Sequence, residues 1–219
     1  SCSNILFVCN VLHGVFLLLY QGAGGAIKLH LMNDNWTELK GEIAGPIDTP
    51  YEGGTFVVAL IDALTVSPQI RFITKIWHPN VSSVTGAICL DILKDQWAAA
   101  LTLRTVLLSL QALLSAAEPN DPQDAVVAKQ YKENPHLFKL TARHWTNVYA
   151  GGPNAIWEFN QKVQRLLDMG IDEHQARVAL STYDWELELV FYDRQGIHMC
   201  LPNLSTSNLT QYIPLNNKQ

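Results

Sequence analysis

A thiol and an amide stand out as residues whose types and spacing could do chemistry. Cys89 follows a polar turn in the stretch IWHPNVSSVTGAICLDILKDQW, and Asn80 precedes it by nine positions (89 − 80). A thiol is both a good nucleophile and a good leaving group, so Cys89 could carry an acyl group as a thioester. No histidine base stands close to Cys89 in sequence, and none is needed if the incoming acyl group is already an activated thioester.

The amide of Asn80 suits the step in which an amine attacks that thioester. Its N–H can donate a hydrogen bond to the oxyanion of the tetrahedral intermediate, and Gly86 allows the intervening turn to fold back. If the attacking amine is that of a lysine, it is cationic in water. A nearby carboxylate could orient it and favour loss of its proton. Asp121, in the proline-bounded loop EPNDPQD, is the first candidate and Asp91 is the second.

Each of these residue types also has a structural interpretation. A lone cysteine such as Cys89 is often a small buried hydrophobe. His78 is more typical of a residue that fixes a turn by bonding to the backbone than of a catalytic base, because Pro79 follows it directly. Trp97 is most simply a core residue. Residue types alone leave these alternatives open.

Composition narrows the class of protein. A chain of 219 residues can form one good core and a small second domain. Its net charge of −5 and lack of a basic run exclude a broad nucleic-acid surface. We predict no metal site and a reduced, cytosolic setting, because the cysteines form no CxxC pair and no Cys/His cluster. They are Cys2, Cys9, Cys89 and Cys200.

The first 26 residues carry no charged side chain, and residues 5–20 are nearly all apolar. This segment lacks the basic leader of a signal peptide and is short for a membrane span. We therefore expect a cytoplasmic protein with no membrane partner and with the nucleus as a second compartment. A signal sequence is the minority alternative.

The hydrophobic pattern predicts strands first and helices afterwards. Alternating side chains predict four strands, joined by short links as in an antiparallel meander, at 27–32, 36–44, 55–61 and 69–76. Helical spacing follows, and the helices are expected at 103–117 with Thr102 as cap, 125–132 and 135–149. This order is typical of the α+β class.

The combination of these stretches resembles the ubiquitin-conjugating enzymes. HPN at 78–80, GAICLDIL at 86–93, Trp97, a long apolar helix and NDP at 120–122 occur in the family's order. ELKGEIAGPIDTPYEGG, RFITKIWHPN and LRTVLLSLQALL add to the resemblance, which covers residues 27 to about 152. It is closest to the branch with a C-terminal ubiquitin-associated domain, which includes the Huntingtin-interacting ubiquitin carriers.

The resemblance implies specific roles. Cys89 would accept the C-terminal glycine of ubiquitin from the activating enzyme, Asn80 would stabilise the oxyanion, and Asp121 would position the acceptor lysine. His78 and Pro79 would hold the active-site loop. ATP would be consumed by the activating enzyme, so no cofactor is expected. The expected partners are ubiquitin, the activating enzyme, ubiquitin ligases and lysine-bearing substrates, and the product would be polyubiquitin of the degradation type.

The resemblance also divides the chain. We expect a divergent apolar leader at 1–26, a ubiquitin-conjugating core at 27–152, a ubiquitin-associated-like helical bundle at 153–196 and a disordered tail at 197–219. In the family, a basic helix stands where the leader is.

Two surfaces of the family have candidate counterparts. The ligase-contact candidates are Pro68, which stands alone in a shortened proline loop, and Trp97, Ala98 and Ala99 of WAAA. In the small bundle, a Met-Gly loop would grip the apolar patch of ubiquitin.

That loop consists of Met169 and Gly170, followed by Ile171 where an aromatic residue is frequent. The last helix, WELELVFYDRQ, lacks the usual Leu-Leu ending.

Two other functions stay open. A non-catalytic module that binds ubiquitin or a ligase could keep this fold, and the altered N-terminus favours it. A thiol hydrolase would need a positioned base, and His78 followed by Pro79 is poorly placed for that role.

Overall fold

A computed structural model describes residues 27–32, 35–61, 69–88 and 103–190 of the chain. They fall into two compact units, one within residues 1–155 and one within 156–219. The boundary comes three residues beyond the predicted one at 152/153 (155 − 152). Several predictions concern residues outside the described ranges: the leader, the tail, the helix cap Thr102, and the site candidates Cys89, Asp91, Pro68, Trp97, Ala98 and Ala99.

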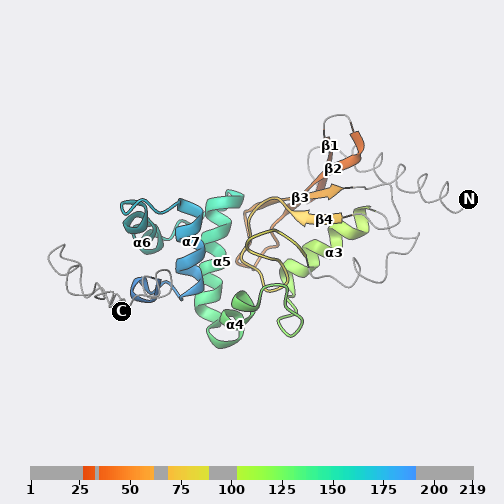
Figure 1. Cartoon of the computed structure of the whole chain (residues 1–219). Helices are drawn as coiled ribbons and strands as arrows, with labels where there is room; N and C mark the ends of the chain where they lie inside the picture. The colour runs from red at the N-terminus through yellow and green to blue at the C-terminus, as the bar shows by residue number, and fades with distance from the viewer. Residues whose placement is uncertain (1–26, 33–34, 62–68, 89–102, 191–219) are drawn as a thin grey trace, which may run out of the picture. The chain divides into compact units, whose positions relative to one another are not determined.

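The first unit is built on a four-stranded antiparallel sheet in the order β1-β2-β3-β4 (Figure 1). Its strands are β1 (Ile27–Met32), β2 (Asn35–Ala44), β3 (Thr55–Ile61) and β4 (Gln69–Phe72). Each strand pairs with the next along the chain, so the predicted meander and the α+β class are confirmed. Alternation along β3 places Phe56, Val58 and Leu60 on the buried face, all at 0 % exposure.

The fourth strand is shorter than predicted. We expected a strand at 69–76, but β4 ends at Phe72. The N–H groups of Ile73 and Thr74 both donate to the Val57 carbonyl, at 2.8 and 3.1 Å. Ile73 and Thr74 together thus lie opposite the single residue Val57 of β3, which is the pattern of a β-bulge. The apolar alternation of QIRFITKI continues through the bulge and therefore could not reveal where the strand ends.

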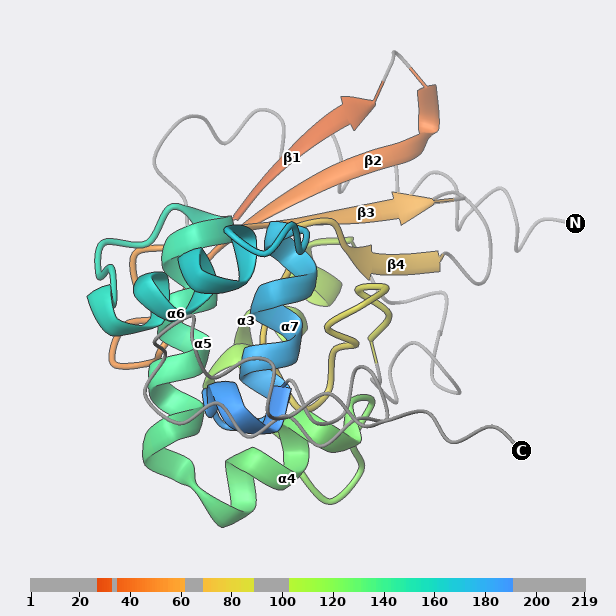
Figure 2. The same ribbon diagram turned by 60° about the vertical axis from the view of Figure 1, so that its left-hand side comes forward.

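Helix α3 (Leu103–Ser115) covers the buried face of the sheet (Figure 2). Its Val106, Leu107 and Leu110 are fully buried, which removes a continuous apolar stripe from water. Close approach to β2 depends on Gly41, because a Cβ at that position would lie 2.7 Å from the Leu107 side chain.

Two further helices, α4 (Ala125–Glu133) and α5 (Pro135–Ala150), complete the first unit, as predicted. Asn134 caps α5 through its side chain, and Gly151 ends that helix in the left-handed conformation at φ 72°. Helix α5 contributes Trp145, which is fully buried with its ring centroid 5.2 Å from that of Trp77.

The second unit contains α6 (Trp157–Leu167) and α7 (Glu173–Thr182), and a further helical turn begins at residue 187. Its core includes Phe159 and Trp185, whose rings stack at 3.7 Å. Lys162 Nζ donates to the Trp185 carbonyl at 2.7 Å. In the described part of the chain, no helix is both long and apolar enough to cross a bilayer.

Candidate active site

His78 anchors the HPN loop from inside the protein. The side chain is fully buried, and Nδ1 accepts a hydrogen bond from the Asn80 N–H at 3.0 Å. Nε2 must therefore carry the proton, and it donates to the Leu113 carbonyl at 3.0 Å. Burial lowers the pKa of His78 to about 4, although the Leu113 carbonyl partly opposes the shift. A neutral imidazole with both nitrogens engaged has the geometry of a loop support.

Pro79 joins the HPN loop to the beginning of α4. Its carbonyl accepts hydrogen bonds from the N–H groups of Gln123 and Asp124, both at 2.9 Å. Asp124 is also the N-cap of α4, accepting from the Val127 N–H at 3.3 Å. The position of the loop is thus tied to a helix terminus more than forty residues away in sequence.

Asn80 connects this loop to the segment that contains Asp121. Its Nδ2 donates to the carbonyls of Glu118, at 2.8 Å, and Asp121, at 2.9 Å. Its Oδ1 accepts from the Glu118 N–H at 2.8 Å. The side chain is only 1 % exposed and uses both amide hydrogens in these bonds. To donate to an oxyanion, as the sequence predicts, Asn80 would have to give up one of its two hydrogen bonds to the carbonyls of Glu118 and Asp121.

Asp121 lies at the surface of the loop that Asn80 holds. The residue is exposed, and its own N–H donates to the Glu118 carbonyl at 3.2 Å. Asn80 and Asp121 were both candidates from the sequence, and the fold brings them together although 41 residues separate them. The exposed Asp121 therefore lies where the loop held by Asn80 reaches the surface.

The turn before Cys89 depends on Gly86, as its sequence suggested. Gly86 has φ 75°, and its N–H donates to the Ser82 carbonyl at 2.9 Å. A Cβ at this position would lie 2.1 Å from the Phe72 carbonyl oxygen, so only glycine fits without displacement of the backbone. Bridge pairing between Val81 and Ile88 then places the residue before Cys89 beside the HPN loop.

Two supporting residues escaped the sequence analysis. Asp124 Oδ2 accepts from both the N–H and the hydroxyl of Ser83, at 3.1 and 2.7 Å, which fixes the turn against α4. The signal for Asp124 was its place before a helix, where aspartate is a favoured cap. Tyr51 gave no signal: its buried hydroxyl donates to the Trp77 carbonyl at 2.9 Å, and burial, with a smaller effect of Tyr131, raises the pKa of Tyr51 well above its usual range.

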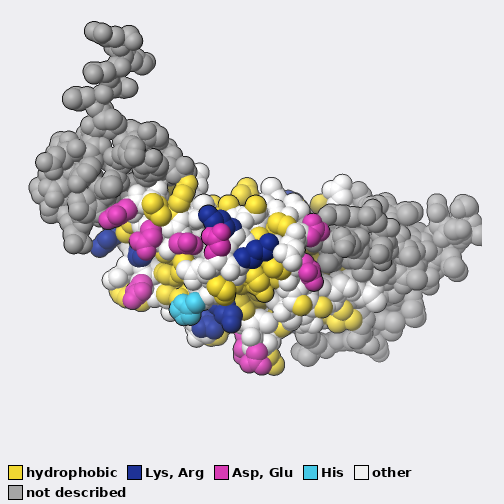
Figure 3. Space-filling view, turned by 90° about the horizontal axis from the view of Figure 1, so that it is seen from below, with side chains coloured by type: hydrophobic (Ala, Val, Ile, Leu, Met, Phe, Trp, Pro, Cys, Tyr) yellow, Lys and Arg dark blue, Asp and Glu magenta, His cyan; other side chains and the backbone are white. Residues whose placement is uncertain are grey.

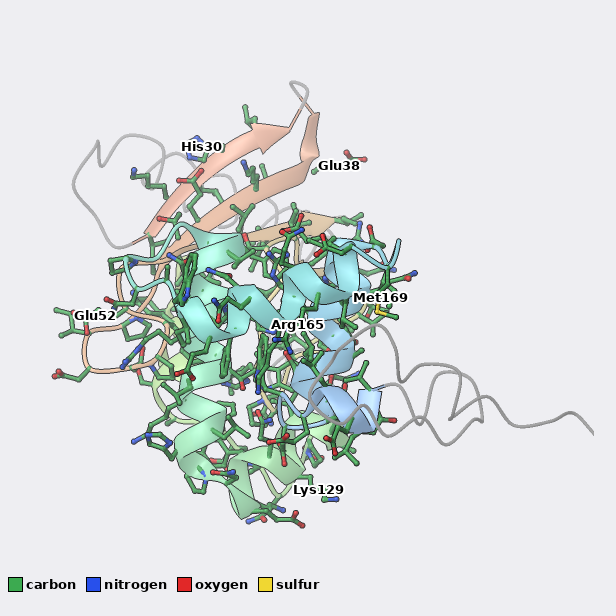
Figure 4. All side chains as sticks on the ribbon, turned by 90° about the vertical axis from the view of Figure 1, so that its left-hand side faces the viewer. His30, Glu38, Glu52, Lys129, Arg165 and Met169 are labelled. Atoms are coloured by element: carbon green, nitrogen blue, oxygen red, sulfur yellow. The ribbon has the colours of Figure 1, made fainter. Side chains whose placement is uncertain are left out.

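The Met-Gly loop of the second unit forms a tight turn between α6 and α7. Gly170 has φ 80°, and its N–H donates to the Leu167 carbonyl at 2.8 Å. The Ile171 N–H donates to the Leu166 carbonyl at 3.1 Å, which gives a backbone carbonyl in the last turn of α6 a hydrogen-bond partner. Met169 is 52 % exposed and projects from the unit (Figure 4). An apolar side chain is thus presented to solvent on a hydrogen-bonded turn.

On the face seen in Figure 3, the described residues form no large patch of a single charge. Figure 3 shows acidic and basic side chains interspersed on the viewed face, with apolar side chains between them. Among the described residues, no group of three or more His, Cys, Asp or Glu side chains could hold a metal ion.

A family model described as ubiquitin-conjugating enzyme matches residues 21–146, which is more than half of the chain. The chain belongs to the ubiquitin-conjugating enzyme family. It is 68 % identical over 166 residues to ubiquitin-conjugating enzyme E2-22 kDa of Drosophila melanogaster, a match that covers 74 % of this chain and 83 % of the relative. It is 63 % identical over 165 residues to ubiquitin-conjugating enzyme E2 K of Homo sapiens, covering 74 % and 82 %.

Solved structures agree with these relatives. The E2 domain of a Toxoplasma gondii ubiquitin conjugating enzyme superposes with a TM-score of 0.60 at 44 % identity, covering 65 % of this chain and 98 % of that one. The predicted family and fold are therefore confirmed. This ubiquitin-conjugating enzyme acts in ubiquitin transfer, and membership of the family implies ubiquitin, an activating enzyme and ligases as its classes of partner.

Proposed function

We propose that this ubiquitin-conjugating enzyme accepts ubiquitin as a thioester on Cys89 and transfers it to lysine. The observation that carries the proposal is the hydrogen-bonded connection between Asn80 and Asp121. It attaches the Asn80 side chain to the backbone of the loop that carries the Asp121 carboxylate, and the Val81–Ile88 bridge leads from the HPN loop to the residue before Cys89.

The proposed reaction has two balanced steps. The Cys89 thiolate attacks the thioester carbonyl of ubiquitin held by the activating enzyme, a new C–S bond forms, and the activating enzyme's thiolate leaves. The lysine amine then attacks the carbonyl of the Cys89 thioester. The tetrahedral oxyanion collapses, the C–S bond breaks and Cys89 leaves as a thiolate, and the nitrogen gives its proton to solvent water as the isopeptide bond forms.

Each candidate has a role in these steps. Asp121, exposed on its loop, orients the incoming lysine and favours loss of its proton, and Asp91 is the second candidate for that role. Asn80 stabilises the oxyanion by giving up one of its two amide hydrogen bonds to backbone carbonyls. It also holds the backbone of Asp121 in place. His78 and Pro79 keep the loop in position.

The products and partners follow from the same proposal. The enzyme builds polyubiquitin of the degradation type, and the exposed Met169 on the turn at Gly170 and Ile171 binds the apolar patch of ubiquitin. Ligases contact the stretch from Trp97 to Ala99 together with Pro68. The enzyme uses no cofactor of its own, since the activating enzyme consumes the ATP, and it works in the cytoplasm.

A charging assay tests the proposal. The protein is incubated with activating enzyme, ATP and ubiquitin, and the products are separated on a non-reducing gel. We expect a thiol-sensitive adduct in the parent and in the matched variants Cys2→Ala and Cys9→Ala, and none in Cys89→Ala. A folded parent that binds ubiquitin without forming an adduct would instead be a non-catalytic binding module.

A further inference from the structure

Asp124 connects three segments of the first unit. Its Oδ1 accepts from the Val127 N–H at 3.3 Å as the N-cap of α4. Its Oδ2 accepts from the N–H and the hydroxyl of Ser83, at 3.1 and 2.7 Å. The Asp124 N–H donates to the Pro79 carbonyl at 2.9 Å. One residue therefore fixes the beginning of α4, the turn at residues 82–86 and the HPN loop relative to one another.

The segments that Asp124 connects lead to two groups of the proposed reaction. Asp121 precedes Asp124 by three positions (124 − 121), in the loop that enters α4. Ser83 precedes Cys89 by six positions (89 − 83). The hydrogen bonds between Asp124 and Ser83 are therefore a short route from the loop of the lysine-orienting carboxylate to the chain of the proposed nucleophile.

The turn between Ser83 and Ile88 is closed by hydrogen bonds, so a shift at one end is passed to the other. The Ser82 N–H donates to the Ala87 carbonyl at 2.8 Å, and Ile88 forms a bridge with Val81. Ser83 is only 7 % exposed, which leaves it little room for a different position while its contact with α4 is intact. Movement of Ser83 away from α4 would thus displace Ile88, the last described residue of this segment.

The bonding of Asp124 suits a residue that positions other groups rather than one that acts on the lysine. Both carboxylate oxygens already accept hydrogen bonds, and Oδ2 accepts two. In the described part of the chain, Asp124 forms no ion pair within 4.0 Å, so its charge strengthens the bonds to Ser83 instead. Asp121, in contrast, is exposed.

A second contact holds the same stretch of chain to α4 without Asp124. The Trp77 Nε1–H donates to Gln130 Oε1 at 2.8 Å, and both side chains are buried. Trp77 precedes the HPN loop and Ser83 follows it, so α4 is attached on both sides of the loop. Loss of the Ser83 contact should therefore loosen one side only, and the protein should still fold.

We propose that Asp124 is a positioning residue for the transfer of ubiquitin to lysine. By holding Ser83, it keeps the chain that leads to Cys89 at a fixed distance from the loop that carries Asp121. The inference rests on the proposed thioester at Cys89 and on the proposed role of Asp121. Attack of an amine requires reacting atoms that are close and aligned, so loss of this contact slows transfer. Charging needs no carboxylate beside a lysine and is less affected.

Asp124→Asn tests the contact while it preserves the helix cap. An asparagine side chain has one acceptor oxygen, and its NH₂ group cannot accept from an N–H. Asparagine is as good an N-cap as aspartate, so the oxygen can keep the Val127 bond while the Ser83 N–H loses its acceptor. The matched control is Asp172→Asn, the same change at the N-cap of α7, where Asp172 accepts from the Gln175 N–H at 3.0 Å.

Discharge of the ubiquitin-charged enzyme to free lysine separates positioning from stability. The kcat of discharge and the KM for lysine are measured in the parent and both variants, well below the temperature of unfolding. Since a misplacement of about 1 Å can cost ~10²-fold, we expect Asp124→Asn to lower kcat by roughly tenfold. The KM should be unchanged, because the exposed Asp121 still meets the lysine, and Asp172→Asn should keep both parental values. An unchanged kcat in Asp124→Asn would overturn the inference.

Ser83→Ala tests whether Asp124 acts through Ser83. This variant removes the hydroxyl donor and leaves the N–H donor in place. We expect a smaller fall in kcat than in Asp124→Asn. The double variant should be no slower than Asp124→Asn alone, because both changes break the same contact. Effects that multiply in the double variant would contradict the route through Ser83.

Amide hydrogen exchange of the uncharged protein gives a readout that does not depend on the reaction. The Ser83 N–H should exchange faster in Asp124→Asn than in the parent, and Asp172→Asn should leave it unchanged. Slower transfer without faster exchange at Ser83 would also overturn the inference.

The same measurements separate this inference from the proposed function. A parent that forms no thiol-sensitive adduct would overturn the proposed function, and the positioning role would fall with it. A parent that is charged, and that discharges at the same rate as Asp124→Asn, would overturn the role of Asp124 alone.

Discussion

The amide of Asn80 donates a hydrogen bond to the carbonyl oxygen of Asp121 at 2.9 Å, across 41 residues of sequence. The same amide also makes two bonds to the backbone of Glu118, one as donor and one as acceptor. Asn80 is therefore part of the support of the loop that carries the proposed lysine-orienting carboxylate. Its effect on transfer can arise from the oxyanion, from this support, or from both.

Replacement of Asn80 distinguishes these contributions. For Asn80→Ala we expect charging of Cys89 to persist while transfer to lysine falls by about 10²–10³, the effect of a lost oxyanion donor. Loss of the three side-chain hydrogen bonds of Asn80 should also lower the free energy of unfolding by about 3 kcal/mol. Single-turnover discharge and urea denaturation measure the two effects.

The outcomes of the Asn80 measurements have different meanings. A slow variant with parental stability would show that the loop support is unimportant and that the oxyanion role dominates. Unchanged transfer to lysine would show that Asn80 has neither role in the reaction.

The buried His78 should make stability depend on pH. Its folded pKa of about 4 lies below the unfolded value of about 6.5, so the unfolded chain binds the proton first as pH falls. The stabilisation is complete above pH 6.5 and is lost progressively toward pH 4, by about 3 kcal/mol. Subtracting the pH profile of His78→Asn from that of the parent isolates this contribution.

A direct titration keeps the His78 prediction testable if that variant does not fold. The ring signals of His78 in the parent protein should show a neutral imidazole at pH 5.5. A midpoint near 6.5 for these signals would contradict the buried, doubly bonded geometry.

Two glycines with similar backbone angles should differ sharply in their tolerance of a methyl group. Gly86 has φ 75° and Gly170 has φ 80°. A Cβ at Gly86 would lie 2.1 Å from a backbone oxygen, whereas none of the described atoms lies within 4 Å of a Cβ at Gly170. Gly170→Ala should therefore cost only the ~1–2 kcal/mol of the left-handed conformation, and Gly86→Ala should cost substantially more. Similar losses in thermal unfolding of the two units would contradict this.

Ubiquitin binding by the second unit should depend on Met169. Because this exposed side chain supplies the apolar contact, Met169→Glu should abolish the chemical-shift changes that ubiquitin causes in the second unit of the full chain. The matched control Gln161→Glu introduces the same charge at an exposed position of α6 and should retain them. Equal binding by both variants would place the ubiquitin contact elsewhere.

The sequence predicted much of the fold because local patterns determine it. Alternation located β1 and β3 to the residue, and the apolar spacing of 103–117 located α3 to within two residues of its end. The end of β4 was missed because a bulge at Ile73 and Thr74, opposite Val57, leaves the apolar pattern unchanged. The hydrogen bonds of Tyr51 and Trp77 depend on tertiary packing, so no spacing in the sequence could predict them.

The candidate site was predictable in part, for a similar reason. Asn80 and Asp121 could be selected because their side chains match the chemistry of aminolysis. The engagement of both Asn80 amide hydrogens could not be predicted, because their acceptors are backbone carbonyls, which every residue has. The roles of Cys89, Asp91 and the ligase-contact candidates stay predictions.

The identity of the atom that carries ubiquitin is the central claim, and Cys89→Ser tests it most directly. Serine in place of cysteine converts a thioester into an oxygen ester, which thiols do not cleave. After incubation with activating enzyme, ATP and ubiquitin, the adducts of parent and variant are measured by intact mass before and after addition of thiol. We predict that the thiol releases ubiquitin from the parent and that any adduct of Cys89→Ser resists it. A thiol-sensitive adduct that persists in Cys89→Ser would contradict the account.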